Sequence, residues 1–156
     1  MAKKNFTITL DSKDLDQQLK TAIRRAPEKT ARAVYGILLD LAGKSARRAP
    51  IESGDLRNDC TAELNKRVVY QDQGIKSLSS ATLRAYGTVG YSLPYALRQH
   101  EDLTLRHDRT DGYRRADGST VNMVAGGEAK YLERPWNENV ARYEKKIALI
   151  VDEVTK

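Results

Sequence analysis

Several residue types on which small proteins rely for cross-links or metal sites are scarce in this chain. The 156 residues include one cysteine, two histidines, one phenylalanine and one tryptophan. A single cysteine, Cys60, cannot form an internal disulfide. No stretch approaches the roughly 20 apolar residues of a membrane span, and the N-terminal residues MAKKNFTITLDSKDL hold no apolar run that could serve as a signal peptide. We therefore expect synthesis and folding in a reducing cytoplasm, without a membrane partner.

The short motifs that identify many enzymes are also missing. The sequence has no G-x-S-x-G nucleophile turn, no phosphate loop of the Walker type and no glycine-rich dinucleotide fingerprint. Cys60 has only Arg57 as a nearby basic residue, so we interpret it as an ordinary small side chain and not as a nucleophile. The sequence therefore offers no recognisable nucleophilic, phosphate-binding or dinucleotide-binding motif.

The two histidines, His100 and His107, are too far apart in sequence for a metal pair on one helix. Two zinc ligands on a helix are usually four residues apart, whereas a separation of seven corresponds to roughly 10 Å of axial rise. The interpretation we favour makes His100 and Glu101 polar groups at the end of a short helix, without a metal. A nuclease or toxin that uses His100, Glu101 and His107 is a competing hypothesis.

Basic residues exceed acidic ones, with a formal net charge of +6 and an isoelectric point near 9.4. This excess suits an acidic partner, although it is spread along the chain. A second hypothesis is therefore a small nucleic-acid-binding module. It would use the arginines of 106–115 together with a helical cluster that comprises Arg24, Arg25, Arg32, Arg47 and Arg48.

Length and hydrophobic periodicity predict an α+β fold in a single domain, residues 1–156. Residues 5–10 alternate as a strand with one buried face. A long N-terminal helix follows from Asp11 or Ser12 to about Arg47, kinked or split near Pro27. Apolar residues at steps of three or four from Leu132 to Val154 predict a C-terminal amphipathic helix. An antiparallel sheet is expected to pack against these helices.

Between the helices the pattern predicts shorter elements. One helical turn is expected at 55–58, strands at about 61–70 and 82–91 form an antiparallel pair joined by a loop, and a short helix covers 94–101. Residues 103–127 are an extended loop or hairpin insertion, with a turn at Asp117-Gly118.

This insertion carries basic residues that alternate with acids, an arrangement that favours protein contact over phosphate binding. Arginine and tyrosine are enriched among the interface residues that contribute most to binding affinity. The candidate partner-contact residues are Arg106, Arg109, Tyr113, Arg114 and Arg115. The alternative, a solvated disordered loop without a fixed partner, stays open.

Three short motifs occur in order along the chain: "APIESGDLR", "YALRQHE" and "KYLERP". They correspond to the patterns AP-x-x-(S/T)-G-x-L-R, Y-A-x-x-x-(H/E)-E and K-(F/Y)-L-x-x-(P/A). The matching residues are Ala49, Pro50, Ser53, Gly54, Leu56 and Arg57; Tyr95, Ala96, His100 and Glu101; and Lys130, Tyr131, Leu132 and Pro135. In this order the chain resembles the tail-completion, minor capsid and head–tail joining proteins of long-tailed bacteriophages, over about residues 45–145.

The resemblance implies an α+β virion structural protein of the neck or connector, with no enzymatic activity, no catalytic residues and no cofactor. It would assemble as a ring of copies, with a hexamer favoured, and join the tail to the DNA-filled head. Its partners would be other neck, connector or tail-tube proteins, with weak contact to passing DNA. It would be located in the virion, and in the host cytoplasm before assembly. A minor capsid role elsewhere in the virion is a further alternative. His100 and Glu101 would then be a structural element near a subunit contact.

Overall fold

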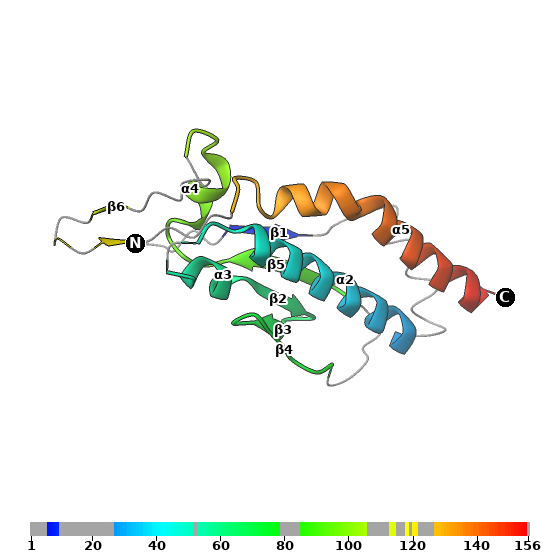
Figure 1. Ribbon diagram of the computed structural model, residues 1–156. Coiled ribbons are helices and arrows are strands. Elements are labelled where there is room, and N and C mark those ends of the chain that lie inside the picture. The colour runs from blue at the N-terminus through cyan, green and yellow to red at the C-terminus, as the bar shows by residue number, and fades with distance from the viewer. Residues whose placement is uncertain are drawn as a thin grey trace.

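The computed structural model describes residues 6–9, 27–51, 53–78, 85–105, 113–114, 118, 120–121 and 127–155. Within these ranges the fold is α+β, as predicted (Figure 1). The main sheet has five strands in the order β1-β5-β2-β3-β4, and every neighbouring pair is antiparallel. The strands are β1 (Phe6–Thr9), β2 (Thr61–Leu64), β3 (Arg67–Gln71), β4 (Gly74–Ile75) and β5 (Gly87–Tyr91).

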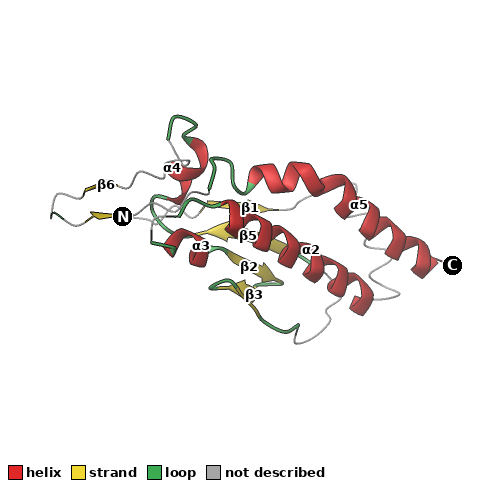
Figure 2. Ribbon diagram, viewed as in Figure 1, coloured by secondary structure: helices red, strands yellow, loops and turns green. Residues whose placement is uncertain are grey.

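The helix α2 (Pro27–Arg48) crosses the sheet, as Figure 2 shows. It begins at Pro27, where proline fits a first helical turn. The helix predicted over the residues before Pro27 lies outside the described residues. Leu38 and Leu41 are fully buried, and Leu38 packs over Gly87, where an added Cβ would lie 2.7 Å from Leu38 Cδ2. The absence of a side chain at Gly87 therefore brings α2 close to the sheet.

The helix α5 (Glu133–Thr155) confirms the predicted C-terminal amphipathic helix. It lies alongside α2 and antiparallel to it, because Lys29 contacts Glu153 while Arg48 contacts Glu138. Tyr143 is buried at this seam, and the partly buried Trp136 ring lies 5.9 Å from the Tyr143 ring. None of the described helices is long and apolar enough to cross a bilayer.

The single strand expected over 61–70 is wrong, because this stretch is a tight hairpin formed by β2 and β3. Asn65 and Lys66 turn the chain with φ of 52° and 65°, a conformation typical of a two-residue hairpin loop. A bulge lies opposite Ala62 and Glu63, so the consecutive residues Val69 and Tyr70 are both buried. The expected antiparallel pairing with the later strand is confirmed, since β2 pairs with β5.

Two short helices complete the fold, α3 (Asp55–Asp59) and α4 (Ala96–Glu101). The hairpin predicted around Asp117-Gly118 is confirmed: β6 (Tyr113–Arg114) pairs with β7 (Thr120–Val121), and Gly118 has a φ of 87°. Arg106, Arg109 and Arg115 lie outside the described residues. The contact role assigned to this insertion therefore stays a prediction.

Candidate functional site

The residues of the three motifs lie together at one end of the molecule, where α2 ends and where α3, α4 and the start of α5 meet (Figure 1). We call this region the motif junction. It is formed by Ala49, Pro50, Gly54, Leu56, Arg57, Tyr95, Ala96, His100, Glu101, Lys130, Tyr131 and Leu132.

Arg57 closes the C-terminal end of α2. Its Nε donates to the Ala49 carbonyl at 3.0 Å, and a terminal guanidinium nitrogen donates to the Arg47 carbonyl at 2.8 Å. The last carbonyls of a helix have no intrahelical donor, so these bonds satisfy groups that would otherwise need water. Leu56 is buried beneath this contact, and Gly54, with a φ of 89°, makes the turn that places both residues. The first motif is therefore a helix cap.

The third motif follows a close approach between two backbone segments. Gly127 has a φ of 127°, and a Cβ there would lie 2.8 Å from the Pro50 nitrogen and closer still to Pro50 Cα. The next residue, Glu128, donates its N–H to the Arg48 carbonyl at 2.8 Å. Only glycine fits this position without displacing Pro50.

Tyr131 connects the second and third motifs in the core. Its side chain is fully buried, and its hydroxyl donates to the Ala96 carbonyl at 2.8 Å. The ring meets Tyr91 edge-on at 4.9 Å between centroids and His100 at 5.0 Å. Such edge-to-face pairs are favourable geometries for aromatic rings. The Tyr131 side chain thus fixes α4 against the end of β5.

His100 is 1% exposed and has contacts at both ring nitrogens. Nε2 accepts the backbone N–H of Glu133 at 3.3 Å, and Nδ1 lies 2.7 Å from Glu101 Oε1. Because a backbone amide can only donate, Nε2 is the acceptor and Nδ1 carries the proton that is donated to Glu101. The His100 carbonyl also accepts the Lys130 N–H at 2.7 Å. His100 therefore joins α4 to the start of α5.

The Lys130 ammonium bridges two carboxylates at the same place. It binds Glu101 Oε2 and lies 2.9 Å from Glu133 Oε2. Hydrogen bonds from Lys130 and His100 lower the pKa of Glu101, and the hydrogen bond to Glu101 raises the pKa of Lys130. These charges form an ion-pair network at the surface of the motif junction. Glu133, one of its three members, was not among the residues selected from the sequence.

His100, Glu101 and Glu133 also have the side-chain types of a zinc site, with ligand atoms within 4.8 Å of one another. Two features of this geometry oppose ligation. The Lys130 ammonium binds both carboxylates, and the His100 nitrogens are engaged with Glu101 and with the backbone of α5. A cation would have to displace a lysine and break a helix-start contact, so we interpret the cluster as a structural network.

Burial of His100 gives the stability of the fold a testable pH dependence. Desolvation lowers the pKa of His100 below 6.5, opposed by the hydrogen bond to Glu101. In the unfolded chain His100 binds a proton near pH 6.5, whereas in the folded chain it stays neutral to a lower pH. The free energy of unfolding therefore decreases as pH falls below 6.5. We expect chemical denaturation at about pH 5.5 to give lower stability than at about pH 7.5. Glu101 has a lowered pKa and stays ionised across this window.

His100→Gln is expected to flatten this dependence, because it removes the group whose pKa is lowered by folding. An unaltered pH dependence in His100→Gln would assign the effect to other groups.

Cys60 is fully buried, and its thiol lies 3.6 Å from the Ala42 carbonyl. Burial raises the pKa of Cys60 to about 12, so the thiolate that a nucleophile requires is scarce at neutral pH. This environment agrees with the interpretation of Cys60 as an ordinary core side chain.

An exposed apolar surface lies beside the motif junction, and the sequence pattern did not predict it. The α4 patch comprises Tyr95, Leu97 and Leu103, with exposed fractions of 43%, 42% and 67%. Asp59 holds the chain just before α4, because its carboxylate accepts the N–H groups of Ser92 and Leu93 at 2.6 and 2.9 Å. Exposed apolar side chains that lie together are typical of a protein contact surface.

Comparison of the chain with family models, with curated proteins and with solved structures found no match. The family resemblance therefore depends on the three motifs alone.

Proposed function

We propose that this chain is a non-enzymatic virion structural protein of the bacteriophage head–tail interface, which assembles as a ring between tail and DNA-filled head. The observation that carries the proposal is the motif junction itself. Three motifs that are far apart in sequence contribute residues to one buried cluster, and polar groups of the second and third motifs bind one another. The motif side chains therefore make contacts within the chain, and these contacts give the subunit the fixed shape that assembly requires.

The engagement of His100 and Glu101 also weighs against the nuclease or toxin hypothesis. An acid–base pair must reach a substrate, yet His100 is buried and Glu101 is held by Lys130. His107, the third member of that hypothesis, lies outside the described residues.

The α4 patch is the surface we assign to contact between copies. A ring needs a heterologous interface, in which one patch meets a different surface of the next copy. Apolar side chains that are exposed in the isolated chain lower the free energy when such an interface buries them. The β6–β7 hairpin and its candidate residues Tyr113 and Arg114 belong to a separate two-stranded sheet, which we propose as a second contact with neck or tail-tube proteins.

Assembly can be tested by native mass spectrometry and electron microscopy of the full chain, alone and with neck or tail-tube partners. We expect rings of several copies. The double variant Leu97→Asp with Leu103→Asp should reduce the assembled fraction by about tenfold or more, because two charges would be buried in the interface. Leu149→Asp is the matched control, since Leu149 is 57% exposed on α5 and lies outside the patch.

A chain that stays monomeric alone and with every partner would contradict the proposal. Equal loss of assembly in the control variant would remove the α4 patch from it. Circular dichroism should show native helix content in both variants.

The nucleic-acid-binding module remains the second candidate, favoured by the net charge of +6. Among the described arginines of its helical cluster, two already form ion pairs with carboxylates of the same chain. Arg32 pairs with Glu28 at 2.5 Å, and Arg48 pairs with Glu138 at 2.6 Å. Tight duplex binding by isolated monomers, with a steep salt dependence, would favour this candidate over ring assembly.

A further inference from the structure

Polar contacts follow the seam between α2 and α5 at nearly every turn. Along the seam, Lys29 pairs with Glu153 at 3.0 Å, Lys44 binds Asn139 at 2.7 Å and Arg48 pairs with Glu138 at 2.6 Å. The i,i+4 ion pair between Asp40 and Lys44 also belongs to this seam. One Asp40 oxygen accepts from Lys44 at 2.8 Å, from the Tyr143 hydroxyl at 2.6 Å and from Arg142.

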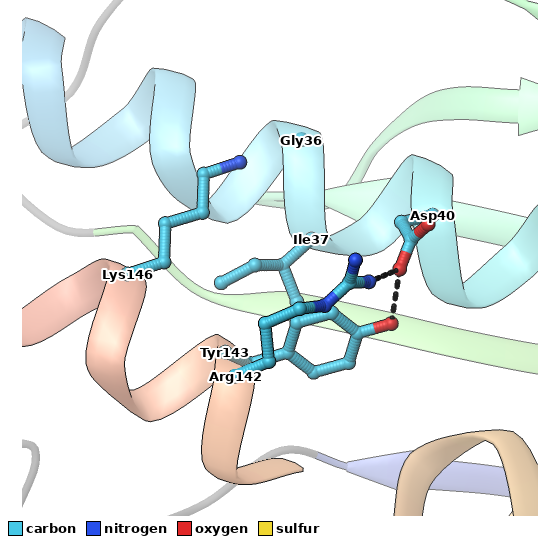
Figure 3. Close-up of a pocket in the computed structure, with 6 residues that line it drawn as sticks. All are labelled: Gly36, Ile37, Asp40, Arg142, Tyr143 and Lys146. Atoms are coloured by element: carbon cyan, nitrogen blue, oxygen red, sulfur yellow. Dashed lines mark hydrogen bonds and ion pairs between the residues drawn. The ribbon is translucent and has the colours of Figure 1, made fainter. Parts of the chain in front are cut away.

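At one helical turn of the seam, α2 presents no acidic residue to the basic residue of α5. Gly36 of α2 faces Lys146 of α5, whose ammonium would lie 3.0 Å from a Cβ placed on the glycine. None of the described residues forms an ion pair or hydrogen bond with the Lys146 ammonium. Figure 3 shows the Lys146 side chain reaching from α5 toward Gly36 on α2. Both residues line a pocket of about 320 Å³. The pocket is lined by Gly36, Ile37, Asp40, Arg142, Tyr143 and Lys146.

The charges around this pocket do not cancel. Lys44, Arg142 and Lys146 contribute three positive charges against the single carboxylate of Asp40, whose pKa is lowered by its donors against the opposing effect of burial. Arg142 and Lys146 are four residues apart on one helix face, and like charges at this spacing repel each other. An anion between them would relieve the repulsion.

The geometry points to a phosphate group as the occupant: we propose that the α2–α5 pocket binds a phosphate through Arg142 and Lys146. The Arg142 guanidinium binds Asp40 through one terminal nitrogen and lies over the Tyr143 ring, 5.4 Å from its centroid. Its other nitrogens and the Lys146 ammonium can bind separate oxygens of a tetrahedral anion. The phosphate can be free or part of a DNA backbone. This inference holds whether or not the chain forms a ring.

The pocket can be tested by titrating the ¹⁵N-labelled full chain with inorganic phosphate. We expect saturable shifts of the Gly36 and Lys146 amide resonances. Lys146→Glu should weaken phosphate binding by about tenfold or more, because an acid would replace a charge-assisted donor. Lys146→Gln should give a smaller loss. Gly36→Glu should abolish phosphate binding, because the new carboxylate would pair with Lys146 in place of the phosphate.

Lys145→Glu is the matched control, because Lys145 is exposed on the same helix outside the pocket. It changes net charge as Lys146→Glu does and should retain binding. A gel-shift titration with a short duplex distinguishes the two sources. Loss of duplex binding in Lys146→Glu alone assigns the site to the DNA backbone, whereas phosphate binding without that loss assigns it to free phosphate. Absence of saturable shifts, or equal weakening in Lys145→Glu, would overturn the proposal.

Discussion

Gly127→Ala is expected to lower the free energy of unfolding by about 3 kcal/mol or more. Two independent costs add at this position. A φ of 127° is a region that residues with a Cβ rarely adopt, which costs about 1–3 kcal/mol. The new methyl group would also collide with the backbone of Pro50, and overpacking of this kind costs about 1–3 kcal/mol more. Because the obstacle is backbone, no side-chain rotation can relieve it.

Gly54→Ala separates the two costs. Gly54 also has a positive φ, 89°, but no atom lies within 4 Å of the position its Cβ would take. The control should therefore lose only about 1–2 kcal/mol, the cost of a left-handed conformation. Urea denaturation followed by circular dichroism measures both values. Equal losses in the two variants would mean that the contact between Gly127 and Pro50 does not constrain the motif junction.

Tyr131→Ala is expected to cost about 3–5 kcal/mol, as is usual when a large buried aromatic side chain is removed. The ring is fully buried and packs against both Tyr91 and His100. The truncation would also leave the Ala96 carbonyl without its donor. We therefore expect α4 to loosen, with faster amide hydrogen exchange at 96–101 than at the centre of α2.

Tyr131→Phe is the conservative partner of this variant. It keeps the ring contacts and removes only the hydrogen bond, so the expected loss is about 1 kcal/mol. Since Tyr131 also belongs to the third motif, assembly should fail in Tyr131→Ala and persist in Tyr131→Phe. A Tyr131→Ala variant with native stability would show that the motif junction tolerates a cavity and would contradict its role as a rigid unit.

The sequence predicts the long elements well, because their signals are repeated over many residues. Apolar residues at helical spacing define α5, and Pro27 marks the start of α2. The β2–β3 hairpin escapes prediction for a local reason. Its turn residues, Asn65 and Lys66, include no glycine, although both have positive φ. The bulge at Val69 then disturbs the alternation that identifies a strand.

The candidate site is harder to predict, because its contacts join residues that are distant in the chain. Motif order selects Glu101 and Lys130 as candidates, but their ion pair spans 29 positions and does not follow from sequence spacing. Glu133 carries no signal beyond its place in the first turn of α5. Asp40 is a second example, because its bond to Lys44 is local in sequence but its bonds to Arg142 and Tyr143 span 102 and 103 positions.

Trp136 gives the chain a built-in optical probe. It is the only tryptophan in the sequence, and its ring lies beside Tyr143 at the seam between the two long helices. Intrinsic emission excited at the indole band therefore comes from a single, known place. Separation of α5 from α2 should shift that emission to the red as water reaches the indole, so one spectrum follows this helix pair without any label.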